Sequence, residues 1–204
     1  MKHQQLEDAK NHLEQIGLTV MMNPDTELKF KGGLAYSLID EKRYSIFCPF
    51  HIRYQAPNWI VIVCCPLVII SVSQQLRQVI LAIENFYKLC EWQRENYNEI
   101  VMALAVLQAY GIAAIVNAAP DKPAILATDI DIQTVENEDT FMIEHAPLVP
   151  ESNAYRIFPH QRQWAIQTPA TTEISPLKIA PIIGEAAEMV VEMCGRTWSE
   201  IDKQ

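Results

Sequence analysis

The sequence contains few glycines, only 6 among 204 residues. Loops that cradle a nucleotide phosphate need glycine where the backbone approaches the ligand closely, so such loops are not expected. Neither a phosphate-loop motif nor a Gly-x-Ser-x-Gly nucleophile motif is present. These absences argue against a nucleotide-dependent enzyme and against a serine hydrolase, and no cofactor is expected.

A long hydrophobic run is also missing. The longest largely apolar stretch, 59–72, has 14 residues and contains Pro66, so it is too short to span a bilayer. The first residues, Met-Lys-His-Gln-Gln-Leu-Glu-Asp, do not form an apolar signal region. We therefore expect a cytoplasmic protein that does not contact a membrane.

The cysteines do not form a disulfide or metal framework by their spacing. There are 5 of them, at Cys48, Cys64, Cys65, Cys90 and Cys194, and most lie in apolar segments. An odd number with irregular spacing is typical of buried thiols in a reducing compartment.

Positive charge is scarce in one half of the chain. Residues 1–97 hold 10 Lys and Arg against 10 Asp and Glu, whereas residues 98–204 hold 6 against 15, which accounts for the net charge of −9. An acidic half repels phosphate, so nucleic-acid binding is not expected. A solvated acidic surface, or one that meets a basic protein or cations, fits this charge better.

What is abundant is hydrophobic residues, at 50% of the chain, and they follow a recurring order of helix and strand patterns. Apolar spacings of three and four predict helices at 3–16, 74–95, 98–110 and 176–195. Strands are predicted at 18–22, 28–31, 34–39, 44–49, 59–73, 112–116, 124–132, 140–145, 154–158 and 163–168. The segment 59–73 is interpreted as one buried strand, bent at Pro66. Gly17, Gly111 and Gly195 are expected to end helices.

The order helix, strands, helix occurs twice, and parts of the two halves match. Leu13 to Asn23 aligns with Leu107 to Asn117, including Gly17 with Gly111. Further along, Trp59 corresponds to Trp164. We predict an α+β protein of two tandem helix–antiparallel sheet–helix units, 1–96 and 97–204, with helices packed on one face of the sheets.

This order resembles the YbjN-like and type III secretion chaperone-like fold. The resemblance is carried by Leu13 to Glu95, with Gly17, the strands around Tyr36 and Ile46, and the segment Leu81-Ala-Ile-Glu-Asn-Phe-Tyr-Lys-Leu. It reaches the second half only through the repeat, and two copies in one chain depart from the family. It implies a chaperone or adaptor that binds other proteins without catalysis.

Two groups of residues are candidate metal ligands. Cys48 and His51 have the C-x-x-H spacing of half a zinc site, but the sequence does not contain a matching second half. Asp129 and Asp131 alternate with two isoleucines, so on a strand both carboxylates would share one face and suit Ca²⁺ or Mg²⁺. The plainer interpretation of Cys48 and His51 is a buried thiol beside a surface histidine. That of Asp129 and Asp131 is an exposed acidic strand face.

Three further features of the sequence are candidate sites. The segment Phe158 to Trp164, with His160, is interpreted as a hairpin turn that returns one aromatic side chain to the core, and less readily as a ligand site. A cysteine hydrolase would need Cys48 or Cys194 beside a histidine. Trp92 and Trp198 stand at the ends of predicted helices and are candidate interface anchors.

The leading hypothesis is a non-enzymatic protein that binds a protein partner or itself, as a chaperone-like adaptor or a structural subunit of a larger assembly such as a phage particle. The alternatives are a metal-dependent or cysteine-based enzyme and a small-ligand sensor with a pocket between the halves.

Overall fold

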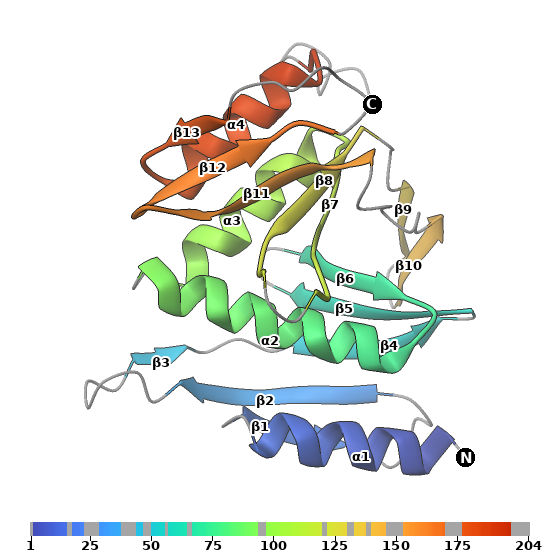
Figure 1. The fold of residues 1–204 in the computed structure, drawn as a ribbon. Helices are drawn as coiled ribbons and strands as arrows, with labels where there is room; N and C mark the ends of the chain where they lie inside the picture. Colours follow the sequence, from blue (N-terminus) through green and yellow to red (C-terminus); the bar gives the residue numbers. More distant parts are fainter. Residues whose placement is uncertain are drawn as a thin grey trace.

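A computed structural model describes residues 2–15, 18–22, 29–37, 44–46, 50–55, 57–64, 67–93, 97–119, 122–129, 133–137, 140–145, 153–169 and 177–196. The fold is α+β, as predicted, with antiparallel sheets flanked by helices (Figure 1). Of the described part, no helix is both long and apolar enough to cross a membrane.

The first half begins and ends with a helix. Its elements are α1 (Lys2–Gln15), β1 (Leu18–Met22), β2 (Lys29–Ser37), β3 (Tyr44–Ile46), β4 (Phe50–Gln55), β5 (Asn58–Cys64), β6 (Leu67–Ser73) and α2 (Leu76–Gln93). The strands form one antiparallel sheet in the order β1-β2-β4-β5-β6, and β3 pairs with β2 beside this path. Helix α1 contacts β1 and α2, and α2 contacts β5 and β6.

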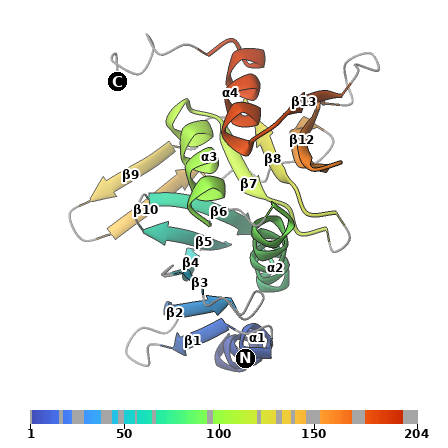
Figure 2. The same cartoon turned by 90° about the vertical axis from the view of Figure 1, so that its left-hand side faces the viewer.

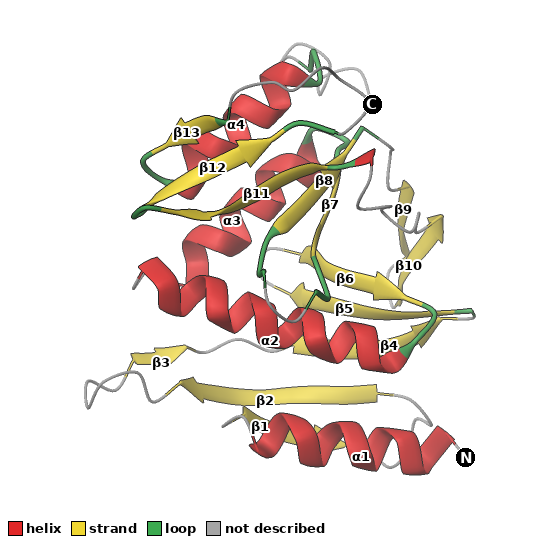
Figure 3. Cartoon of the chain, in the orientation of Figure 1, coloured by secondary structure: helices red, strands yellow, loops and turns green. Residues whose placement is uncertain are grey.

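The second half repeats this order of elements (Figure 3). It contains α3 (Tyr97–Ala109), β7 (Ala113–Val116), β8 (Ile125–Thr128), β9 (Gln133–Asn137), β10 (Thr140–His145), β11 (Tyr155–His160), β12 (Gln163–Gln167), β13 (Lys178–Ala180) and α4 (Ile183–Met193). Its main sheet runs β7-β8-β11-β12-β13, and β9 and β10 form a separate hairpin. In both sheets, therefore, the extra strand or hairpin is inserted between the second and third strands of the main path.

The halves share one hydrophobic core. A single cluster of buried side chains joins α2 and the helix-facing side of β5 and β6 to α3, α4 and the helix-facing side of the second sheet. A smaller cluster joins the opposite face of β5 and β6, at Ile60, Ile62 and Ile69, to Ala113 and Ile115 of β7. Figure 2 shows α2 and α3 at the level where the halves meet.

This double burial explains the apolar run at 59–72. Strands covered on both faces are apolar at nearly every position, so alternation is lost. The interpretation of 59–73 as one strand bent at Pro66 is wrong. This segment forms two antiparallel strands, β5 and β6, which lie side by side with Cys64 paired to Leu67. Proline lacks the N–H that a strand ladder requires, so its presence in the sequence favours a break between two strands over the interior of one.

Other boundaries also differ from the prediction. Gly32 and Gly33 lie inside β2 rather than between two strands, and β4 and β9 were not predicted. The helix predicted at 176–195 begins only at Ile183, because β13 precedes it and pairs with β12. Gly111 and Gly195 end their helices as expected, with φ of 71° and 69°, and Ile112 and Arg196 donate the closing hydrogen bonds to Leu107 and Val191.

Candidate functional site

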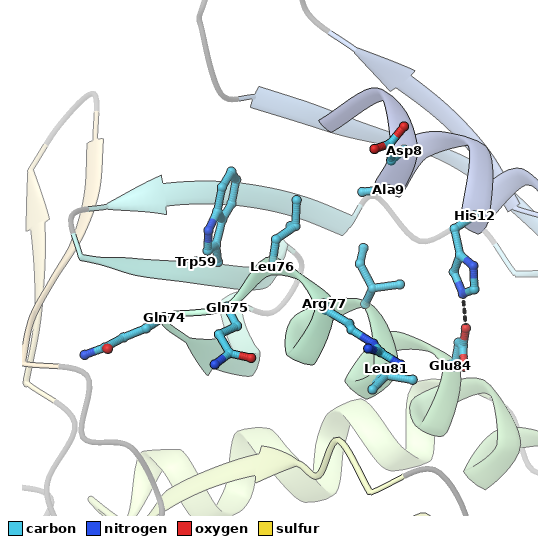
Figure 4. A pocket seen from close by; sticks show the side chains of 11 residues that line it. Asp8, Ala9, His12, Trp59, Gln74, Gln75, Leu76, Arg77, Leu81 and Glu84 are labelled. Carbon is cyan, nitrogen blue, oxygen red and sulfur yellow. Dashed lines mark hydrogen bonds and ion pairs between the residues drawn. The ribbon is translucent and has the colours of Figure 1, made fainter. Parts of the chain in front are cut away.

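A groove of about 730 Å³ lies in the first half, between α1 and the first turns of α2 (Figure 4). Helix α1 contributes Asp8, Ala9 and His12, and β5 contributes Trp59. The other wall consists of Gln74 and Gln75, which precede α2, and of Leu76, Arg77, Ile80, Leu81 and Glu84 on α2. Groove volumes of this size are typical of binding sites.

The base of the groove is apolar and firmly held. Trp59 is 5% exposed and Ile80 is 6% exposed, and the Trp59 ring packs against Tyr54 with a centroid separation of 5.0 Å. Ser73 Oγ accepts a hydrogen bond of 3.1 Å from the backbone N–H of Gln75 just before α2 begins, a turn that fixes how the chain enters the helix.

Charged side chains of both signs surround this base. His12 Nε2 and Glu84 Oε1 form a hydrogen bond that connects α1 to α2 and closes one end of the groove (Figure 4). Asp8 accepts a hydrogen bond of 3.0 Å from Gln4 Nε2, and Arg77 is exposed on the α2 side. The groove is thus an apolar surface with separate acidic and basic positions on its two walls.

The predicted metal ligands are not brought together in the described part of the chain. Asp129 follows the end of β8 and is exposed, and its Oδ1 accepts hydrogen bonds from Arg196 Nη2 at 2.6 Å and Nε at 3.1 Å. A carboxylate bound by a guanidinium fork is already matched in charge. Asp131 and Cys48 lie outside the described residues. His51 lies on β4, opposite Lys31 and Ile62, and its side chain is not described.

No group of three His, Cys, Asp or Glu side chains that would hold a metal ion occurs among the described residues. Cys90 is buried and Cys194 is half-buried, and both are thiols. Burial, with the nearby Asp129 carboxylate, raises the pKa of Cys194 to about 11. Cys194 is therefore protonated near neutral pH and does not fit the activated nucleophile of a cysteine hydrolase.

The hairpin predicted around His160 is confirmed. His160 pairs with Gln163 across a two-residue turn, and Trp164 returns to the core with 0% exposure. Trp92 lies in the last turn of α2 without a described side chain, and Trp198 lies outside the described residues. Their role as interface anchors remains a prediction.

Sequence reasoning missed the polar residues that join the halves. Gln108 on α3 donates from Nε2 to the carbonyls of Ile69 and Ala114, each at 2.8 Å, and its Oε1 accepts from the Ile69 N–H at 3.0 Å. It thereby pairs the free edge of β6 and also contacts β7. A single glutamine within a helical pattern carries no signal of this role.

A second polar connection lies at Asn85 of α2, which is 1% exposed. Its Nδ2 donates to the carbonyls of Asn117 at 2.9 Å and Ala119 at 2.7 Å. Asn117 Oδ1 in turn accepts from the Ala124 N–H at 2.9 Å, and its Nδ2 donates to the Lys122 carbonyl at 2.9 Å. An asparagine on the apolar side of a helix is a sequence signal that could have indicated this connection, but it was not used.

No protein-family model, curated protein or solved structure matches the chain. The resemblance to the YbjN-like and type III secretion chaperone-like fold therefore stays a prediction. The groove is a candidate site because of its volume and its lining residues.

Proposed function

We propose that this chain is a non-enzymatic protein that binds a protein partner through the groove between α1 and α2. It would act as a chaperone-like adaptor or as a structural subunit of a larger assembly, a phage particle included. The observation that carries this proposal is an accessible apolar groove with Asp8 on one wall and Arg77 on the other. Apolar anchors with a polar surround are the usual anatomy of a protein-binding surface. The thiols of Cys90 and Cys194 suit the cytoplasm.

A small-ligand sensor is a second candidate, because about 730 Å³ lies within the range of small-molecule sites. The groove lies within the first half, whereas the sequence suggested a pocket between the halves. The base offers Trp59 and aliphatic side chains, and the polar groups stand at the margins. A small ligand would be expected to meet converging polar groups, so the protein partner is favoured.

The test is site-specific photocrosslinking in the native cells. A photoreactive amino acid is placed at Leu81, which lines the groove, and in a control at Glu185, which is exposed on α4. We expect the Leu81 probe to yield a discrete protein adduct that the Glu185 probe does not yield. The adduct should then be reproduced with the two purified proteins.

Two results would count against a protein-binding groove. One is a Leu81 probe that gives no protein adduct, or the same adducts as Glu185. The other is a small molecule that co-purifies with the chain and is displaced when Leu81 is replaced by Asp, which would support the sensor.

A further inference from the structure

The two halves place a tryptophan in the same position relative to the following helix. Trp59 on β5 pairs with Ser73 on β6, and α2 begins three residues later, at Leu76. Trp164 on β12 pairs with Ala180 on β13, and α4 again begins three residues later, at Ile183. The surface above Trp59 in the first half therefore corresponds to the surface above Trp164 in the second.

In the second half this surface is filled. Helix α3 packs against α4, and it buries five apolar side chains, namely Ile100, Val101, Ala103, Leu104 and Leu107. On α4, Ile183 and Ala187 are 1% and 0% exposed, as is expected where two helices are in close contact. The buried side chains of α3 and Trp164, which is 0% exposed, belong to one apolar cluster.

In the first half the corresponding surface stays open. Among the described side chains of α1, only Ala9 and Leu13 are buried. Of the three that line the groove, Asp8 and His12 are polar and Ala9 is small. A polar helix face does not displace water from an apolar neighbour. Leu76 and Leu81 therefore remain partly exposed as groove walls.

An extended peptide does not suit this groove. Its base is β5, an interior strand that pairs with β4 on one side and β6 on the other, and its walls are helices. Strand addition needs a free sheet edge to bind the peptide backbone, and the groove does not present one. An α-helix satisfies its own backbone hydrogen bonds and needs only side-chain contacts.

We infer that the groove binds an amphipathic α-helix of the partner protein, whose apolar face covers the groove side chains that the described part of α1 leaves exposed; this rests on the proposed function. The lining positions of α2 run from Leu76 to Glu84, about 12 Å along the helix axis, or about two turns. The partner helix presents apolar residues at i, i+3 or i+4, and i+7. A basic residue faces Asp8 and an acidic residue faces Arg77.

The inference is tested with two yeast-displayed peptide libraries of about 16 residues. In one, an apolar stripe and two flanking charged positions are randomised on a helical host. The other is identical except for two central prolines, which prevent the helix. We expect the full-length chain to enrich binders from the helical library only, with an acidic residue at the position that faces Arg77.

Two variants locate the binding. Leu81→Asp should weaken the selected peptides about tenfold or more. Arg77→Glu should weaken them by about two- to fivefold, and a Lys in place of the acidic peptide residue should restore the affinity. Arg162→Glu, at the β11–β12 turn, is the matched control and should leave binding unchanged. Unchanged melting temperatures show that each variant is folded.

Three results would overturn the inference that the groove binds a helix. They are equal enrichment from both libraries, no enrichment from the helical library, and binding that is insensitive to Leu81→Asp. If crosslinking at Leu81 captures a partner through an extended segment, the proposed function stands and this inference fails. If selected helices bind the groove but cells yield no adduct, the helix specificity stands and the proposed function fails.

Discussion

Gln108 connects the halves through three hydrogen bonds of one side-chain amide. Replacing it with Leu keeps the volume similar but leaves the Ile69 N–H and two carbonyls without this partner in a partly buried place. We expect Gln108→Leu to lower the free energy of unfolding by about 2–4 kcal/mol. Urea denaturation followed by circular dichroism measures it. Gln167→Leu, at an exposed position of β12, is the control, and an equal loss in both variants would contradict the role of Gln108.

Cys194 gives a prediction about pH. Its pKa is raised to about 11, whereas an unfolded cysteine has a pKa of about 8.5. The folded chain therefore keeps the proton longer than the unfolded chain, so the contribution of this thiol to stability is complete below about pH 8.5 and declines toward pH 11.

Iodoacetamide labelling of the Cys194 peptide, read by mass spectrometry across pH, should show a midpoint well above that of the urea-unfolded chain. Fast labelling of the native protein at pH 7 would instead indicate an activated thiol and would revive the cysteine-based enzyme.

At the scale of single residues, little of the site was predictable. Asp8, His12, Arg77 and Glu84 look like ordinary solvated charges of two helices, because sequence spacing does not show that α1 and α2 face each other. Asn85 and Gln108 bind backbone groups that lie 32 and 39 residues away, and such pairings depend on tertiary structure alone. Trp164 was predictable as a core residue because a turn and a strand frame it.

Elements were predicted better than residues. The helices α1, α2 and α3 follow their apolar spacing, because a helix with one buried face records that face at every third or fourth position. The start of α4 was missed because β13 has only three residues, too few to show alternation. Strands β5 and β6 were merged because both faces are buried.

The turn between β11 and β12 does not contain the residues that are preferred in a turn of this kind. Gln161 and Arg162 have φ of 47° and 66°, and this left-handed pair is a hairpin turn that Asn-Gly adopts more easily. Gln161→Asn with Arg162→Gly should raise the free energy of unfolding by about 0.5–1 kcal/mol. Thermal denaturation measures the change. Since neither residue of the turn lines the groove, binding of the selected helices should not change. A loss of stability would contradict the left-handed turn.

At the scale of the whole molecule, the repeated order of elements was predictable and the shared core was not. The strand and helix patterns recur along the chain, and motif positions such as Leu13 and Leu107 are buried in both halves. Whether two such units separate or fuse depends on which faces meet. Here the face of β5 and β6 that points away from α2 packs against β7 and β8, and one cluster of buried side chains includes residues of α2, α3 and α4.

The shared core implies that neither half folds alone. A fragment 1–96 would expose the back of β5 and β6 and would lose Gln108 from the edge of β6, and a fragment 97–204 would expose Ile115 and Leu126. We expect each fragment to lack a cooperative transition by circular dichroism, whereas the full chain unfolds in one transition that tryptophan fluorescence and circular dichroism report alike. Mixing the two fragments should restore part of the native signal. If the full chain instead unfolds in two steps and each fragment reproduces one of them, the halves are independent domains, and the polar contacts of Gln108 and Asn85 stabilise only their association.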